Sequence, residues 1–134
     1  MIVALDHIAI AVPSLDKAIE RFVRDLGLNC ESTEEIADQL VTVAMFPVPP
    51  TKIELLQATA DDSAIGKFVR KRGGGMHHLC FRSDDLDNDI DRLRDRGYQF
   101  LSDEPSIGAG GHRVIFIHPD SFDGVLVELA SSAD

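Results

Sequence analysis

An internal repeat constrains the fold of this chain more than any other feature. The segment LDHIAI around His7 resembles MHHLCF around His78, and these two histidines lie 71 residues apart. The segment IELL around Glu54 also resembles VELA around Glu128, at an offset of 74 residues. Each half therefore carries a His near its start and a Glu near its end. Such a repeat indicates two copies of one supersecondary unit.

Both halves predict the same order of elements, β-α-β-β-β. Ser14 and Asp85 are expected N-caps of a helix in each half, and Gly27 and Gly97 are the expected stops. Helices are predicted over 15–25 and 86–96, and strands over 3–12, 29–33, 41–46, 52–56, 76–83, 99–102, 114–118 and 124–129. We expect one α+β domain spanning 1–134, with module one over about 3–58, a linker helix over about 61–72 and module two over about 75–130.

Composition excludes several classes of protein. The chain has 134 residues, and 13 Lys plus Arg against 23 Asp plus Glu give it a net charge of −10, which disfavours binding to nucleic acid. No apolar run is long enough for a membrane span. A strand-like run begins at Ile2, so a signal peptide is not expected, and two cysteines, Cys30 and Cys80, make no disulfide framework. These features predict a cytoplasmic, globular protein.

The repeated His and Glu residues are expected on one type of strand face. Successive strand residues point to opposite faces, so His7 shares its face with two alanines while the isoleucines around it point the other way. His78, Glu54 and Glu128 likewise alternate with apolar neighbours. We expect the apolar face to pack under the helix of each half, which leaves the four polar residues on the other face.

Two imidazoles and two carboxylates suit a divalent transition metal such as Zn, Co, Ni or Mn. One His or Glu alone on a strand is most often a tolerated polar residue. Four at duplicated positions favour a ligand set, because a carboxylate in an apolar strand is costly unless something pairs with it.

The chain resembles the methylmalonyl-CoA epimerases, within the vicinal oxygen chelate superfamily that also holds glyoxalase I and dioxygenases. The segments that carry the resemblance run from Leu5 to Leu129 and are LDHIAIAVPSLDKAIERF, TKIELLQ, SAIGKFVRKRGGGMHHLCF, GAGGHRVIFIHP and GVLVEL. The segments MHHLCF, GAGG, HP and GVLVEL in this order are more specific to the epimerases than the superfamily pattern.

The resemblance implies a fold, a reaction and a site. The modules would form a cup-shaped mixed sheet with helices on the outside, and a homodimer is expected by analogy. The reaction would interconvert (2R)- and (2S)-methylmalonyl-CoA in propionate metabolism. The implied metal ligands are His7, His78 and Glu128, with Glu54 at the fourth position. A loop beside the substrate would contain Gly108, Ala109, Gly110 and Gly111.

The ligands fit the chemistry of such a reaction. Removal of the C2 proton gives an enolate, which a bound metal stabilises as a Lewis acid. One group must remove the proton and another must return it on the opposite face. Glu128 is the first candidate and Glu54 the second. Some relatives place a further carboxylate on the strand that here reads VTVAMF, which has none, so the second acid/base stays open.

Other polar residues have weaker assignments. Lys67 and Arg70 belong to a basic cluster that could hold CoA phosphates or simply be a solvated helix face. Strand parity places His77 and Gln57 on the faces opposite His78 and Glu54, and His118 is expected to be a turn residue.

Two other functions remain open. A lactoylglutathione lyase of the glyoxalase I type would use the same ligand set and also moves a proton beside a carbonyl. A non-catalytic ligand-binding or resistance protein of the same fold would need no metal ligands. A dioxygenase is disfavoured, because its iron site takes two His and one carboxylate and leaves the fourth ligand unexplained.

Overall fold

A computed structural model describes residues 1–132, which form two compact units. The N-terminal unit comprises His7–His77, and the C-terminal unit comprises Met1–Asp6 together with the chain from His78 onward. Strand β1 (Ile2–Ala11) starts in the C-terminal unit and continues into the N-terminal unit, and β5 (Gly75–Ser83) does the reverse. The predicted pair of β-α-β-β-β modules is confirmed.

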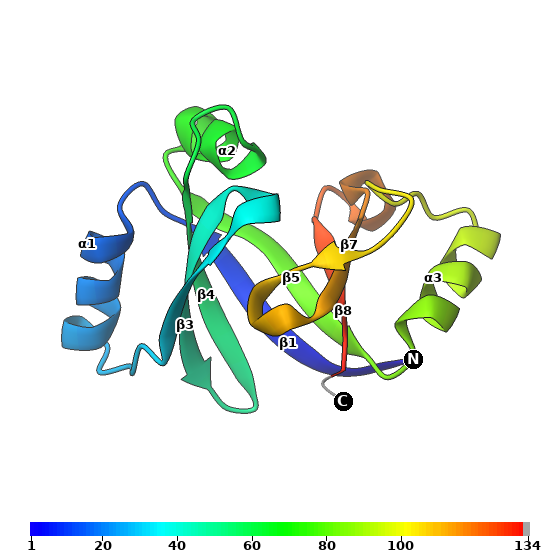
Figure 1. The fold of residues 1–134 in the computed structure, drawn as a ribbon, viewed down its shortest axis with the longest axis horizontal. Helices are drawn as coiled ribbons and strands as arrows, with labels where there is room; N and C mark the ends of the chain where they lie inside the picture. Colours follow the sequence, from blue (N-terminus) through cyan, green and yellow to red (C-terminus); the bar gives the residue numbers. More distant parts are fainter. Residues whose placement is uncertain (133–134) are drawn as a thin grey trace. The chain divides into compact units, whose positions relative to one another are not determined.

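The sheet of the N-terminal unit has the strand order β2-β3-β4-β1. Its edge strand β2 (Ser32–Ile36) and β3 (Val41–Val48) pair antiparallel, as do β3 and β4 (Thr51–Ala58), whereas β4 and β1 run parallel. Helix α1 (Leu15–Glu20) continues as a π-helical turn over Arg21–Asp25 and lies beside the β3–β4 hairpin (Figure 1). Helix α2 (Ala64–Arg72) follows β4.

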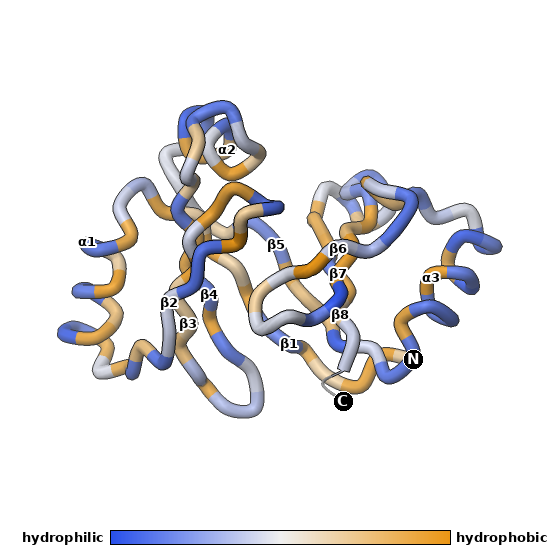
Figure 2. The backbone as a smooth tube through the Cα atoms, viewed as in Figure 1, coloured by the Kyte–Doolittle hydropathy of each residue, from blue (hydrophilic) through white to orange (hydrophobic). Residues whose placement is uncertain are grey.

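The core of the N-terminal unit lies between α1 and the sheet. Its buried members are Val12, Leu15, Ala18, Ala44, Phe46 and Leu55. Figure 2 shows hydrophobic residues gathered on one side of α1 and hydrophilic residues on the other. This amphipathic pattern explains why the helix packs on the sheet with a fixed face.

The C-terminal unit repeats this plan with the strand order β1-β5-β8-β7-β6. Strands β5 and β8 (Val127–Ser131) are parallel, and β7 (Arg113–Ile117) pairs antiparallel with β8 and with the short β6 (Ser106–Ile107). Helix α3 (Leu86–Asp95) packs on this sheet. The buried core is formed by Leu86, Ile90, Ile115, Ile117, Val127 and Leu129.

The expected helix signals are confirmed. The Ser14 hydroxyl accepts a hydrogen bond from the backbone N–H of Lys17, and the Asp85 carboxylate accepts one from Asn88, so both residues cap their helices. Gly27 and Gly97 adopt positive φ values of 71° and 91°, as expected of helix stops. The linker helix begins at Ala64, later than expected, because Ser63 caps it by accepting from the Gly66 N–H.

Three predicted strands differ from the structure. The first short strand lies at Ser32–Ile36 rather than 29–33. The strand predicted over 99–102 is wrong: Phe100 makes a single bridge to Ile117, and the paired strand is β6. The last strand begins at Val127 rather than 124, because a 3-10 turn over Pro119–Phe122 and two residues with positive φ delay the extended backbone.

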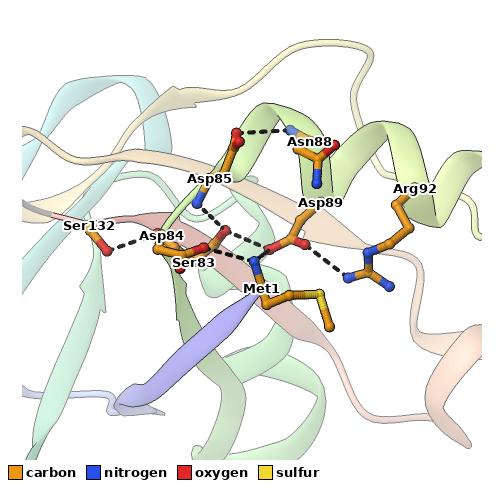
Figure 3. A network of polar contacts seen from close by, with 8 residues as sticks. All are labelled: Met1, Ser83, Asp84, Asp85, Asn88, Asp89, Arg92 and Ser132. Carbon is orange, nitrogen blue, oxygen red and sulfur yellow. Dashed lines mark hydrogen bonds and ion pairs between the residues drawn. The ribbon is translucent and has the colours of Figure 1, made fainter.

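Asp89 on α3 is a charged residue inside the C-terminal unit. It has no solvent exposure, and Figure 3 shows it accepting hydrogen bonds from the Ser83 hydroxyl (2.6 Å) and from Arg92 (2.9 Å). The Met1 ammonium group lies 3.2 Å from its carboxylate and 2.8 Å from that of Asp84. Burial alone would raise the pKa of Asp89, but the bonds from Ser83, Arg92 and the ammonium group outweigh it and lower that pKa. The hydrogen bond to Asp84 raises the pKa of the ammonium group.

The composition predicts no membrane span and no disulfide framework. Among residues 1–132, no helix has both the length and the apolar character needed to cross a bilayer. Cys30 and Cys80 are both free thiols, as expected.

Candidate active site: one His–Glu pair in each unit

The N-terminal unit brings His7 and Glu54 together. His7 lies on β1 and Glu54 on the parallel neighbour β4, where Glu54 is the register partner of Ala9. The His7 Nδ1 and Glu54 Oε2 atoms are 3.1 Å apart, within hydrogen-bond distance. The residues are only 6% and 5% exposed, so the pair is withdrawn from bulk water.

The C-terminal unit contains an equivalent pair, His78 and Glu128. His78 lies on β5 and Glu128 on the parallel neighbour β8, where Glu128 is the register partner of Cys80. The His78 Nε2 and Glu128 Oε1 atoms are also 3.1 Å apart, and the two residues are 7% and 4% exposed. The repeat in the sequence therefore places the same two residue types on equivalent parallel strands of both units.

The local sequence explains why these polar residues share a face. Strand neighbours of the pairs point the other way and pack under the helices: Leu55 belongs to the core beneath α1, and Val127 and Leu129 belong to the core beneath α3. Side chains alternate along a strand, so the His and Glu residues lie on the face away from the helix of their unit. The parity argument made from the sequence is confirmed for both units.

The two pairs differ in the atoms used and in their surroundings. His7 faces its carboxylate through Nδ1, whereas His78 uses Nε2. The ring of His78 also meets the ring of Phe116 edge to face, with centroids 5.0 Å apart and planes at 89°. Phe116 on β7 is the register partner of Glu128, as Met45 on β3 is the register partner of Glu54. The register partner of the carboxylate is thus a phenylalanine in the C-terminal pair and a methionine in the N-terminal pair.

Each pair can act as a ligand set and as a proton-transfer group. Imidazole nitrogen and carboxylate oxygen are ligands of divalent transition metals, and two such pairs supply four donors. A buried carboxylate beside an imidazole can also accept or release a proton at a carbon acid. The donor chemistry therefore fits the divalent metal that the sequence predicts.

The glycine run lies in the C-terminal unit. The Gly108 N–H donates a hydrogen bond to the His112 carbonyl, which closes a tight loop after β6. Ala109–Gly111 form a 3-10 turn in which Gly110 and Gly111 have φ values of 71° and 78°. These left-handed conformations explain the glycines at both positions.

The basic residues of the linker lie on α2 in the N-terminal unit. Arg70 donates a 2.7 Å hydrogen bond to the Asp61 carbonyl. With Gln57, it also lines a cavity of about 370 Å³ between α2 and the ends of β1 and β4. Lys67 lies one turn earlier on the same helix. Neither residue lies on the strands that carry the His–Glu pair of its unit.

Three polar residues lie outside the pairs, as strand parity predicts for Gln57 and His77 and as the expected turn predicts for His118. Gln57 accepts a hydrogen bond from the Leu15 N–H at the start of α1, on the helix face of the sheet. The ring of His77 packs edge to face on Phe68 of α2. His118 accepts from the Asp120 N–H and so caps the turn that follows it.

A second cavity, of about 480 Å³, lies in the C-terminal unit on the face of the sheet opposite the His78–Glu128 pair. Its walls are mostly apolar and include Leu79, Phe81, Val127 and Leu129, which alternate along the strands with the His78–Glu128 pair. Strand alternation therefore separates this cavity from the pair.

Sequence reasoning missed Met45 and Phe116, the residues that flank the two carboxylates. A signal was present, since these residues are also 71 positions apart. It was too weak to find alone, because Met and Phe are ordinary core residues and only strand register shows which of them face a Glu.

Comparison with known proteins agrees with this geometry. Residues 6–116 match the model of the Glyoxalase/Bleomycin resistance protein/Dioxygenase superfamily. The chain is 43% identical over 131 residues to the ethylmalonyl-CoA/methylmalonyl-CoA epimerase of Cereibacter sphaeroides, covering 96% of this chain and 98% of that protein. It is 40% identical to the mitochondrial methylmalonyl-CoA epimerase of Homo sapiens, covering 93% of this chain and 72% of the human one.

Solved structures show the same relationship. A variant of the Streptomyces coelicolor methylmalonyl-CoA epimerase in complex with 2-nitronate-propionyl-CoA superimposes with a TM-score of 0.96 at 37% identity, covering 100% of both chains. A methylmalonyl-CoA epimerase in complex with methylmalonyl-CoA and NH4+ also gives 0.96 at 37% identity, covering 99% of this chain and 96% of that one. The chain belongs to the methylmalonyl-CoA epimerase family, within the Glyoxalase/Bleomycin resistance protein/Dioxygenase superfamily.

Proposed function

We propose that this protein interconverts the (2R) and (2S) epimers of methylmalonyl-CoA by removing and returning the proton at C2. The observation that carries the proposal is the buried His–Glu pair present once in each unit. The names of the relatives support methylmalonyl-CoA as the substrate. The name of the Cereibacter sphaeroides protein also includes ethylmalonyl-CoA, which carries an ethyl group in place of the methyl group. A 2-alkylmalonyl-CoA is therefore the proposed substrate class.

The two modules, about 3–58 and 75–130, are proposed to serve one metal centre. His7, Glu54, His78 and Glu128 would hold a divalent ion, and Co, Ni, Mn and Zn all accept this mixture of imidazole and carboxylate. When bound, the metal supplies Lewis acidity that stabilises the charge of an enolate.

The protein's own carboxylates are proposed to move the proton. Removal breaks the C2–H bond and transfers its proton to a carboxylate, while the electron pair passes into the adjacent carbonyl. Return on the opposite face requires a second acid. Glu128 is the first candidate for one of these roles and Glu54 for the other. Both carboxylates are buried, so bulk water has little access to the proton that is transferred.

Deuterium incorporation at C2 tests this function. Protein loaded with Co²⁺ is incubated with (2S)-methylmalonyl-CoA in deuterated water, and the epimers and their deuterium content are followed. We expect exchange at C2 and equilibration of the epimers. Turnover of the methylglyoxal–glutathione hemithioacetal without exchange would reassign the protein as a lactoylglutathione lyase.

The CoA part of the substrate is proposed to bind outside the His–Glu pairs. Lys67 and Arg70 on α2 would contact its phosphates, and the loop Gly108–Gly111 would lie beside the acyl group. Cationic side chains are needed for this contact because the whole chain carries a charge of −10. Lys67→Ala should raise KM for methylmalonyl-CoA about tenfold with kcat unchanged. Lys17→Ala on α1 serves as the control, and an unchanged KM in both variants would remove α2 from this role.

A homodimer and a cytoplasmic location are proposed from analogy with such enzymes. Light scattering of the purified protein tests the first: a mass of two chains supports it, and a mass of one chain contradicts it.

A further inference from the structure

Met45 is the strand neighbour of Glu54 in the N-terminal unit. It is the antiparallel register partner of Glu54 on β3, and Ala9 is the parallel partner on β1. Residues paired across neighbouring strands place their side chains on the same face. Glu54 is therefore flanked by a fully buried methyl group on one side and a half-buried thioether on the other.

Phe116 holds the same position in the C-terminal unit, but its ring already has a partner. It is the register partner of Glu128 and packs edge to face against the ring of His78. Such aromatic pairs prefer a fixed geometry. Methionine, by contrast, is unbranched and has three rotatable side-chain bonds, so it adapts to the shape of a neighbouring apolar group. Of the two equivalent positions, Met45 is the one suited to contact a variable substituent.

We propose that Met45 determines the largest alkyl substituent at C2 that the enzyme accepts. The inference rests on the proposed function, in which the substrate is a 2-alkylmalonyl-CoA. Its C2 atom carries a proton, a carboxylate, a thioester carbonyl and an alkyl group. The first three require a base, ligands or hydrogen-bond donors, whereas the alkyl group requires an apolar surface. Beside Glu54 that surface is Met45, since Ala9 is too short to limit the space.

Substrate discrimination tests this role. The values of kcat/KM for C2 exchange are measured with methylmalonyl-, ethylmalonyl- and propylmalonyl-CoA. Met45→Ala should raise the propyl-to-methyl ratio about tenfold, because one methylene in an apolar pocket changes discrimination by about 10- to 200-fold. Met45→Phe should lower the ethyl-to-methyl ratio by a similar factor.

The ratio separates specificity from folding. A variant that merely unfolds in part loses activity toward all three substrates equally, so its ratios stay constant. Phe46→Leu is the matched control: Phe46 adjoins Met45 on β3 but packs on the other face in the core beneath α1, and its ratios should equal those of the wild type. Unchanged ratios in both Met45 variants would overturn this inference alone. Wild-type protein inactive on all three substrates would instead overturn the proposed function.

Discussion

The two units share a His–Glu pair on one face of their sheets and differ in what they bury under the helix on the other face. At the repeat offset of 71 residues, Ala18 on α1 corresponds to Asp89 on α3, and both residues have no solvent exposure. The N-terminal unit fills this position with a methyl group inside an apolar core. The C-terminal unit fills it with a carboxylate bonded to Ser83 and Arg92 and next to the Met1 ammonium group (Figure 3).

The opposite faces hold a His–Glu pair in both units, with nitrogen and oxygen 3.1 Å apart, although His7 uses Nδ1 and His78 uses Nε2. The helix-packed face thus accepts different chemistry in the two units, apolar contacts in one and hydrogen-bonded polar contacts in the other. The face with the pairs repeats the same residue types, as the proposed shared role requires.

Removal of the carboxylate charges should have the largest effect. We expect Glu128→Gln to slow C2 exchange about 1,000-fold, because a positioned acid/base contributes about 10²- to 10⁴-fold. Glu54→Gln should slow it less, about 100-fold, because Glu54 is the second candidate. The measurement is deuterium incorporation under single-turnover conditions. Glu35→Gln, at an exposed position on β2, is the control and should exchange at the wild-type rate. Retained exchange in Glu128→Gln would remove Glu128 from proton transfer.

An acid introduced into the apolar helix face should destabilise the N-terminal unit. We expect Ala18→Asp to lower the free energy of unfolding by about 4 kcal/mol, because a buried charge lacking its partners costs about 3–5 kcal/mol. Arg21 already occupies the position equivalent to Arg92, but Val12 stands where the other unit has Ser83. The double variant Val12→Ser, Ala18→Asp should therefore recover part of the loss. Urea denaturation measures both, and equal stability of Ala18→Asp and the wild type would contradict the comparison.

Loss of the native buried carboxylate should cost less. We expect Asp89→Asn to lower the free energy of unfolding by about 2 kcal/mol, because a hydrogen bond to a charged group is worth about 1.5–3 kcal/mol. The loss stays in this range because the Arg92 side chain is partly exposed and can bind water instead. Asp87→Asn is a control on the same helix, because Asp87 pairs with Arg113 at the surface. It should change stability little.

The effect of Asp89 should depend on pH. Its pKa is lowered in the folded protein from an ordinary value of 3.8, so its contribution is full above about pH 4 and is lost as the pH falls through the lowered pKa. The difference in unfolding free energy between the wild type and Asp89→Asn should therefore shrink below about pH 4. A difference that grew toward acid pH would contradict the assigned direction.

The smallest expected change in stability concerns a position with left-handed backbone that is Leu in one unit and Gly in the other. Leu40 has φ 55°, and the residue 71 positions later is Gly111, with φ 78°. Left-handed backbone costs a non-glycine residue about 1–2 kcal/mol, and glycine's entropy offsets about half of that. We expect Leu40→Gly to raise the free energy of unfolding by about 0.5 kcal/mol, seen as a higher melting temperature. Leu26→Gly is the control and should lower it, because Leu26 has φ −100°.

The helices and the strand faces were predictable from the sequence, because they depend on local periodicity and capping. The two helices with their caps at Ser14 and Asp85 were found, as was the face on which each His–Glu residue lies. The short strand β6 was missed, because two residues give no alternation, and Asp89 was not expected inside a core, because only tertiary contacts with Ser83 and Arg92 make that burial tolerable. Which histidine nitrogen meets each carboxylate also depends on side-chain rotation, which sequence does not reveal.

Metal stoichiometry tests most directly whether the two His–Glu pairs serve one centre. Wild-type protein, His7→Ala and His78→Ala are saturated with Co²⁺, dialysed and analysed for cobalt per chain, with circular dichroism as the check on folding. We predict about one ion per wild-type chain and loss of most of it in each variant, because the proposed site takes ligands for one ion from both units. Two ions per chain, with one retained in each variant, would contradict the account by showing that each unit binds metal on its own.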